Sequence, residues 1–232
     1  MILKLGDILV DLTQKDVQNI HLSVYPPNGT VKMTAPLYIS EESLQLYAIS
    51  KLSWIKKEQK KFKDQARESN RIFIQRESIY FWGKRYLLET NFTKSRPKIE
   101  FDEFNIRLYI PEHYTLEQRI HYFNHWYRKK LREFAEPLIY FWANKLQVTP
   151  NKLLISKMKT KWGSCNPIDK NIRLNTELAK KPKSSVEYII VHELIHLIES
   201  SHNDRFVTLL DQYLPDWQLR KEQLNELPIH FN

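Results

Sequence analysis

The feature that most constrains this chain is a group of histidines near its carboxyl-terminal end. His192 and His196 are four residues apart in the sequence His-Glu-Leu-Ile-His, and His202 follows six residues later. On a helix, side chains four residues apart lie on one face, with Cβ atoms about 5–6 Å apart. The spacing therefore predicts a helix on which two imidazoles reach one metal ion, at zinc–nitrogen distances of about 2.0–2.1 Å.

Glu193 lies about 100° around the same helix from His192. In that position its carboxylate flanks the ion without binding it, where a general base is needed beside a water molecule on the metal. Three protein ligands leave a fourth position on zinc for water, which is typical of a catalytic site. We therefore expect Zn²⁺, or another divalent ion, held by His192, His196 and His202.

The third ligand requires the helix to end, because His202 is on the wrong side of an unbroken helix that carries His192. The sequence favours an end near Glu199–Ser201, where serine side chains compete for backbone hydrogen bonds. Asn203 or Asp204 then caps a following helix. The interpretation of His202 as a ligand depends on this break.

Composition limits the other possibilities. The chain has 232 residues, 42% hydrophobic and 27% charged, as in ordinary globular proteins. Its single cysteine, Cys165, excludes an internal disulfide and a cysteine-rich zinc ribbon. The amino terminus does not resemble a signal peptide, and no stretch has the roughly 20 apolar residues of a membrane span. We expect a cytoplasmic protein that does not enter the membrane; the oligomeric state is left open.

The charge is strongly positive, with a net value of +9 and a pI near 9.4. The lysines and arginines are spread along the chain and interrupted by acids, so most of them are expected to be solvated surface. Direct nucleic-acid binding is therefore the less favoured reading of the charge. An anionic substrate such as a nucleotide would use the same field.

The fold class expected is α+β, with residues 1–112 forming a β-rich region that contains one helix. A hairpin is predicted around Asn28-Gly29 and a second one around Gly83, because both positions favour tight turns. Helical spacing of apolar residues runs from Ser40 to a charged tail near Glu68. The aromatic residues of the second hairpin are expected to be sheet core.

Residues 113–232 are expected to form the catalytic domain. Thr115 caps a long helix, 116–146, which Pro137 should kink or split. A half-exposed strand is predicted from Leu153 to Trp162-Gly163, followed by a turn and a returning strand that completes a hairpin. The hairpin either holds an extended peptide at its edge or serves only as packing. Lys161 and Arg173 are candidates for stabilising negative charge in a transition state.

The stretch Lys159–Cys165, the strand Ile172–Asn175 and the motif Val191–His196, with His202 and Phe206, together resemble the YgjP-like metal-dependent hydrolases. These are relatives of the WLM and SprT-type minimal zincins, and the resemblance covers most of the chain. It implies a zincin-like catalytic part in which the three histidines bind the metal and Glu193 is the general base.

Two departures from related families limit the comparison. Glu199 stands where the metzincins have a glycine, so the turn after His196 must be made differently. The absence of a cysteine-rich ribbon argues against SprT-like repair of DNA crosslinks.

The sequence therefore predicts a zinc-dependent hydrolase of the YgjP-like metallopeptidase family. The substrate, a peptide or a nucleotide, is left unresolved, because some members of this family are described as nucleoside-triphosphate (UTP) pyrophosphohydrolases. A nucleic-acid-associated binding protein is the non-enzymatic alternative. An intact Glu193 argues against it, since a structural metal site needs no base.

Overall fold

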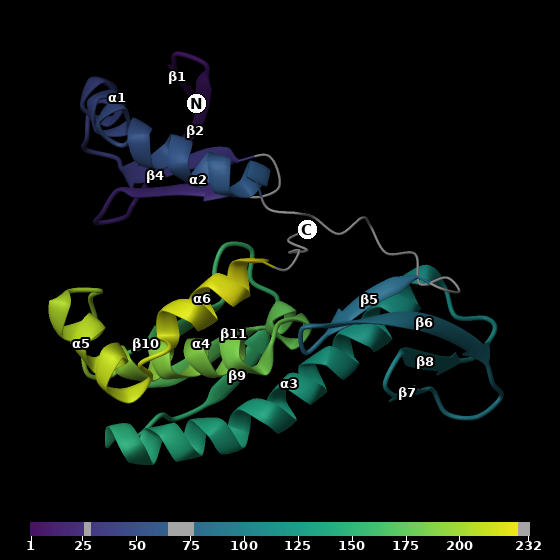
Figure 1. Ribbon diagram of the computed structural model, residues 1–232. Helices are drawn as coiled ribbons and strands as arrows, with labels where there is room; N and C mark the ends of the chain where they lie inside the picture. The colour runs from purple at the N-terminus through teal and green to yellow at the C-terminus, as the bar shows by residue number, and fades with distance from the viewer. Residues whose placement is uncertain (26–28, 65–76, 227–232) are drawn as a thin grey trace. The chain divides into compact units, whose positions relative to one another are not determined.

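The computed structural model describes residues 1–25, 29–64 and 77–226. The described residues form an α+β protein, as predicted, and separate into two compact units, one within residues 1–64 and one within 77–226 (Figure 1). None of the described helices is both long and apolar enough to cross a membrane.

The first unit is a four-stranded sheet with two helices. The strands are β1 (Ile2–Leu5), β2 (Ile8–Lys15), β3 (His21–Tyr25) and β4 (Thr30–Pro36), in the order β1-β2-β4-β3. The pair β2 and β4 is parallel, and the other neighbours are antiparallel. Buried residues alternate along β2, which gives the sheet one apolar face.

The helices of this unit are α1 (Glu41–Ser50) and α2 (Leu52–Asp64). The expected single helix is therefore wrong: Lys51 ends α1, and α2 begins directly after it. The two helices contribute Leu44, Ala48 and Ile55 to the core formed with the strands. The expected tail near Glu68 lies outside the described residues.

The hairpin predicted around Asn28-Gly29 joins β3 to β4, which pair antiparallel. Residues 26–28 lie outside the described residues. Gly29 has a φ of +71°, and a Cβ there would lie 2.8 Å from Cγ of Gln59 on α2. Glycine is therefore required both by the backbone and by the close approach of the helix.

The second unit begins with another four-stranded sheet. Its strands are β5 (Ser78–Phe81), β6 (Lys84–Phe92), β7 (Lys98–Phe101) and β8 (Asn105–Ile110), in the order β5-β6-β8-β7. The second hairpin is confirmed, with Trp82 and Gly83 both at positive φ in a two-residue turn. Of the hairpin aromatics expected to be sheet core, Phe81 and Tyr86 are buried, whereas Tyr80 and Trp82 are only partly buried.

Helix α3 (Leu116–Leu146) is the longest element of the described residues. Thr115 caps it as predicted, accepting a hydrogen bond from the backbone N–H of Gln118 in a capping box. Of the two outcomes predicted at Pro137, a kink or a split, the split is wrong, because the helix continues through this residue. The kink stays a prediction. Buried residues on both sides of the proline, Ala135 and Ile139 among them, belong to one core and hold the two halves together.

The strands β5 to β8 share their core with α3. The ring of Phe81 lies 4.6 Å from that of Trp126, and the hydroxyl of Tyr127 donates to the carbonyl of Tyr80 at 2.6 Å. Figure 1 shows β5 and β6 beside the beginning of the long teal helix. These strands therefore pack with the second unit, whereas the sequence analysis grouped them with residues 1–112.

A three-stranded sheet precedes the histidine motif. It consists of β9 (Leu153–Ser156), β10 (Gly163–Asn166) and β11 (Asn171–Asn175), in the order β10-β11-β9. The hairpin β10–β11 is confirmed, but the single strand from Leu153 to Gly163 is wrong. The chain leaves the sheet after Ser156, and β9 pairs parallel with β11 instead.

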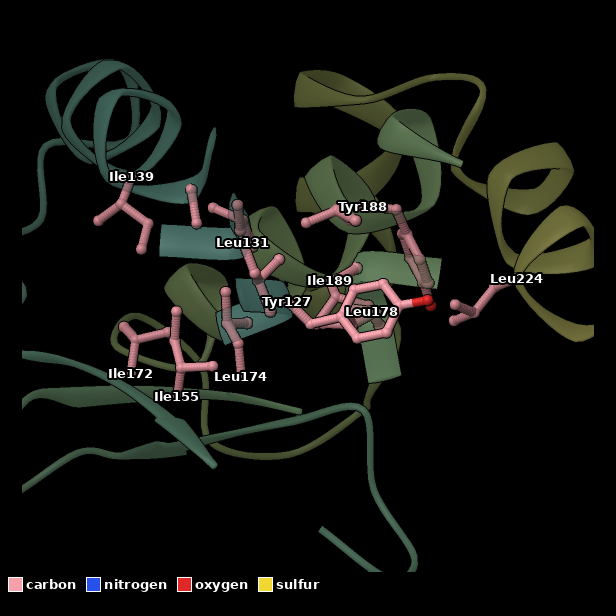
Figure 2. Close-up of a cluster of buried hydrophobic side chains, with 14 of the residues drawn as sticks. Tyr127, Leu131, Ile139, Ile155, Ile172, Leu174, Leu178, Tyr188, Ile189 and Leu224 are labelled. Carbon is pink, nitrogen blue, oxygen red and sulfur yellow. The ribbon is translucent and has the colours of Figure 1, made fainter. Parts of the chain in front are cut away.

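The remaining elements are helix α4 (Lys183–Ile195) and its neighbours along the chain. These neighbours are η1 (Thr176–Lys180), α5 (Asp204–Tyr213) and α6 (Trp217–Glu226). Helix α4 contacts α3, α5, α6 and the hairpin strands β10 and β11. Figure 2 shows how the buried side chains of these elements meet around α4, from Leu131 of α3 and Leu174 of β11 to Leu224 of α6. The site helix is thus fixed from several directions by one apolar core.

Candidate metal centre

The three histidines of the motif converge. The ring centroids of His192, His196 and His202 lie 4.7–4.9 Å from one another. The Nε2 atoms of His192 and His202 are 2.9 Å apart, and one ring nitrogen from each histidine lies within 4.8 Å of the others. The convergence predicted from the spacing is therefore confirmed.

The turn after α4 brings His202 back towards the helix. The backbone N–H groups of Leu197 and Ile198 donate to the carbonyls of Leu194 and Ile195, three residues earlier, as in a 3₁₀ turn. Helix α4 therefore ends with His196 as its C-cap, earlier than the expected end at Glu199–Ser201. The helical face that carries His192 and His196 therefore stops directly before the reversal.

Asn203 starts the next helix, and this settles the choice left open between Asn203 and Asp204. Its side chain accepts a hydrogen bond from the N–H of Phe206 at 3.0 Å. The cap fixes the direction in which α5 leaves the turn. It therefore also fixes the position of His202, the residue just before it.

Phe206 lies against all three histidines. Its ring centroid is 4.9 Å from that of His192, 4.8 Å from His196 and 4.7 Å from His202, and its side chain is fully buried. A flat apolar ring at this distance limits the rotation of each imidazole. Phe206 is one of the residues that carry the family resemblance, but no role was predicted for it from the sequence.

The chemistry of these nitrogens suits a metal ion. Burial, with smaller effects from the other two histidines and Lys221, lowers the pKa of His192 to about 3. Burial also lowers the pKa of His196, so both imidazoles are neutral and keep a lone pair at neutral pH. The Nδ1–H of His196 donates to the carbonyl of Glu199 at 3.1 Å, which leaves Nε2 as the free ligand atom.

Glu193 lies beside this cluster in a tight space below strand β10. Its side chain is 5% exposed, and a Cβ at Gly163 would lie 2.6 Å from Oε1 of Glu193. Burial raises the pKa of this carboxyl to about 7, against the opposing effects of Lys161 and of the Cys165 N–H, which donates to it. A carboxyl group with a pKa near 7 exchanges protons readily at neutral pH.

Asn175 holds the irregular segment that leads into β10. Its side-chain amide is fully buried and donates to the carbonyls of Met158 and Lys161, at 2.9 and 2.8 Å. Its backbone N–H donates to the carbonyl of Trp162 at 2.8 Å. Asn175 belongs to the strand that carries the family resemblance, but its anchoring role was not predicted, because a strand-end asparagine has no distinctive pattern.

The histidines and Glu193 open into a cleft of about 580 Å³. One wall is formed by the segment from Lys161 to Cys165, which includes the first three residues of strand β10, and another by Lys221, Leu224 and Asn225 of α6. Of the two cations proposed for charge stabilisation, Lys161 lines the cleft and Arg173 does not. No sequence signal identified α6 as part of the site.

Comparison with protein families identifies the chain. The sequence model of the family described as the YgjP-like metallopeptidase domain matches residues 18–227, which is most of the sequence. The chain belongs to the YgjP-like metallopeptidase family. It is accordingly a metal-dependent hydrolase, and the family implies a divalent ion to which the three converging imidazoles are suited.

Among solved structures, the YgjP-like chain is similar to two archaeal metallopeptidase zymogens. Jannalysin of Methanocaldococcus jannaschii is 26% identical, with 38% of this chain and 87% of that chain covered and a TM-score of 0.33. Abylysin of Pyrococcus abyssi is 17% identical, with 40% and 98% covered and a TM-score of 0.36. A comparison with curated proteins finds no match.

Proposed function

We propose that this YgjP-like chain is a zinc peptidase in which His192, His196 and His202 hold the ion and Glu193 is the general base. The observation that carries the proposal is the meeting of three imidazoles beside a buried carboxyl group that binds none of them. Three nitrogen ligands are a donor set of catalytic zinc sites, and a free carboxylate beside them can serve as the base. Structural zinc sites need no such base.

Zinc, when bound, supplies a Lewis acid and lowers the pKa of a coordinated water to about 7. The rest of the chemistry belongs to the chain. Glu193 accepts the proton of the water that attacks the peptide carbonyl and then donates it to the leaving nitrogen. Lys161, which lines the cleft and acts on Glu193, is placed to offset negative charge that develops on the carbonyl oxygen.

Strand β10 is the element we assign to the peptide backbone. It is at the edge of its sheet, paired with β11 on one side, and Gly163 to Cys165 line the cleft. An extended peptide can add to such an edge by main-chain hydrogen bonds. This arrangement would hold the scissile carbonyl next to Glu193, since Gly163 is in contact with that side chain.

Metal analysis of variants tests the ligand assignment. The His196→Ala protein is expected to lose bound zinc, whereas His125→Ala, at an exposed position on α3, should retain it. Zinc content of the purified proteins, measured after dialysis, supplies the readout. A His196→Ala protein that still holds one equivalent of zinc would show that the ligand set is wrong.

A nucleoside-triphosphate pyrophosphohydrolase is the second candidate function. It is favoured by the two lysines, Lys161 and Lys221, that line the cleft and could contact phosphates. Incubation of the metal-loaded protein with casein and with UTP separates the two activities. Turnover of UTP alone, with Mg²⁺ or Mn²⁺ preferred over Zn²⁺, would favour the nucleotide, because phosphate chemistry suits hard ions bound by oxygen.

A further inference from the structure

Helix α6 is firmly attached to the site helix. Arg220 pairs with Glu187 of α4 at 2.5 Å, and its backbone carbonyl accepts a hydrogen bond from the Ser185 hydroxyl at 3.2 Å. The ring of Trp217 stacks on that of Tyr188, with an interplanar angle of 18°. These contacts hold the inner face of α6 in a fixed position beside His192.

The inner face of α6 presents one cation to the cleft. Lys221, Leu224 and Asn225 line the cleft, as do Tyr188 and Ile189 of α4. Leu224 is buried, whereas Lys221 is exposed, with its Nζ atom 5.5 Å from the centre of the Trp217 ring. The wall therefore combines a small apolar surface with a positive charge at its rim.

No carboxylate of the described residues forms an ion pair with Lys221. The neighbouring cation of α6 behaves differently: Arg220, one residue before it, pairs with both Glu187 and Asp216. Lys161 lines the cleft on the other wall. Two lysines therefore line the cleft, and one of them, Lys161, acts on the charge of Glu193.

We propose that Lys221 determines substrate specificity by pairing with a carboxylate of the bound peptide, close to the scissile bond. The carboxylate belongs either to an acidic side chain or to the carboxyl terminus of the peptide. Leu224 and Ile189 contact the apolar part of the same residue. The proposal rests on the peptidase function proposed above and names the substrate class of that site.

The chemistry of lysine fits this role. An ammonium group on a flexible stem is a point charge that accepts a carboxylate from several directions, whereas a guanidinium favours one bidentate geometry. The group is exposed, so its contribution is that of a surface ion pair and amounts to about a threefold to fivefold difference in affinity. Preference for acidic peptides should therefore be moderate and sensitive to salt.

Binding to a protein that cannot turn over its ligand tests the proposal directly. The zinc-loaded Glu193→Gln protein is titrated with short peptides that differ only in Glu or Gln at one position, each with a free or an amidated carboxyl terminus. Lys221→Gln in this background should weaken binding of the acidic peptides about threefold to fivefold and leave the neutral amidated peptide unchanged. Lys221→Glu should favour a lysine-containing peptide instead.

Lys145→Gln is the matched control, since Lys145 also lies over a tryptophan ring, 4.6 Å from that of Trp142, but outside the cleft. It should change no affinity. If Lys221→Gln removes only the preference for the Glu peptide over the Gln peptide, the carboxylate is that of a side chain. If it removes only the preference for a free over an amidated carboxyl terminus, the carboxylate is the terminus. Either result supports the proposal. Equal affinity of the Glu193→Gln protein with Lys221 intact for acidic and neutral peptides would overturn the proposal.

Failure of the peptidase function is distinguishable from failure of this inference. Kinetics of the protein with Glu193 intact give the same comparison as KM values, and Lys221→Gln should raise the KM of the acidic peptides about threefold to fivefold. Peptide cleavage without charge preference would overturn the role of Lys221 alone. Absence of both peptide cleavage and peptide binding, with UTP bound instead, would overturn the role of Lys221 and the peptidase function together.

Discussion

Gly163 and Glu193 are in direct contact: the carboxylate of Glu193 fills the space that a Cβ at position 163 would occupy. Such a Cβ would lie 2.6 Å from Oε1 and 2.9 Å from Cγ of Glu193. The φ angle of Gly163 is not positive, unlike that of Gly6, Gly29 and Gly83. Its lack of a side chain therefore serves to admit the carboxylate below strand β10, and a backbone requirement does not explain it.

Gly163→Ala is expected to displace the Glu193 carboxylate. A misplacement of about 1 Å can lower turnover about a hundredfold. The three heavy atoms nearest to a Cβ at position 163 all belong to Glu193 and none to a histidine, so zinc content should be unchanged. The control is Arg173→Ala, an exposed residue on the paired strand β11 that does not line the cleft. Turnover of the Gly163→Ala protein at the rate of the unmodified protein would show that the contact has no functional role.

Asn175→Ala should destabilise the segment before β10. The carbonyls of Met158 and Lys161 each lose a donor, and each unsatisfied group costs about 1–3 kcal/mol if it stays buried. We expect the free energy of unfolding in urea to fall by at least about 1–3 kcal/mol, the cost of one such group. Turnover should fall as well, because β10 is no longer held. An unchanged urea midpoint would contradict the anchoring role of Asn175.

Phe206→Ala should weaken both the fold and the metal site. Removing a fully buried phenylalanine costs about 3–5 kcal/mol, and here it also frees three imidazoles to rotate. Zinc affinity, measured by competition with a chelator, should fall, while Phe206→Leu should recover part of it. Phe141→Ala, at a position that is 54% exposed, is the control. Undiminished zinc affinity in folded Phe206→Ala would show that the ring does not position the ligands.

Cys165 reports the charge of Glu193 in the metal-free protein. Burial, and then the negative charge of Glu193, raise the pKa of this thiol to about 11. The thiolate is the reactive form, so alkylation should be slow at neutral pH and rise with a midpoint near 11, against about 8.5 in the urea-unfolded chain. Glu193→Gln should lower the midpoint in part. A midpoint in the folded protein equal to that of the unfolded chain would contradict the buried environment.

The sequence predicted those parts of the site that depend on local spacing. The helix under His192 and His196, a break before His202 and a cap at Asn203 or Asp204 were predicted from hydrogen-bonding rules that act within a few residues, although the helix ends earlier than expected. The Thr115 cap was predictable for the same reason. None of these features requires knowledge of a tertiary contact.

The features that were missed depend on contacts between distant residues. The alternating pattern after Leu153 indicated a strand, but the buried amide of Asn175 takes the carbonyls of Met158 and Lys161 and so keeps the segment out of the sheet. Pro137 lies in an unbroken helix because core packing on both sides outweighs the lost hydrogen bond. The place of Lys221 in the cleft depends on how α6 packs on α4.

The role of Glu193 as general base beside the zinc site is tested most sharply by the turnover and the zinc content of the Glu193→Gln protein, measured on the same preparation. Glutamine keeps the shape of the side chain but cannot accept the proton, and general base catalysis contributes about 10²–10⁴-fold. We expect one equivalent of bound zinc, with peptide hydrolysis lowered by about that factor. Hydrolysis at the rate of the unmodified protein, with zinc still bound, would contradict that role.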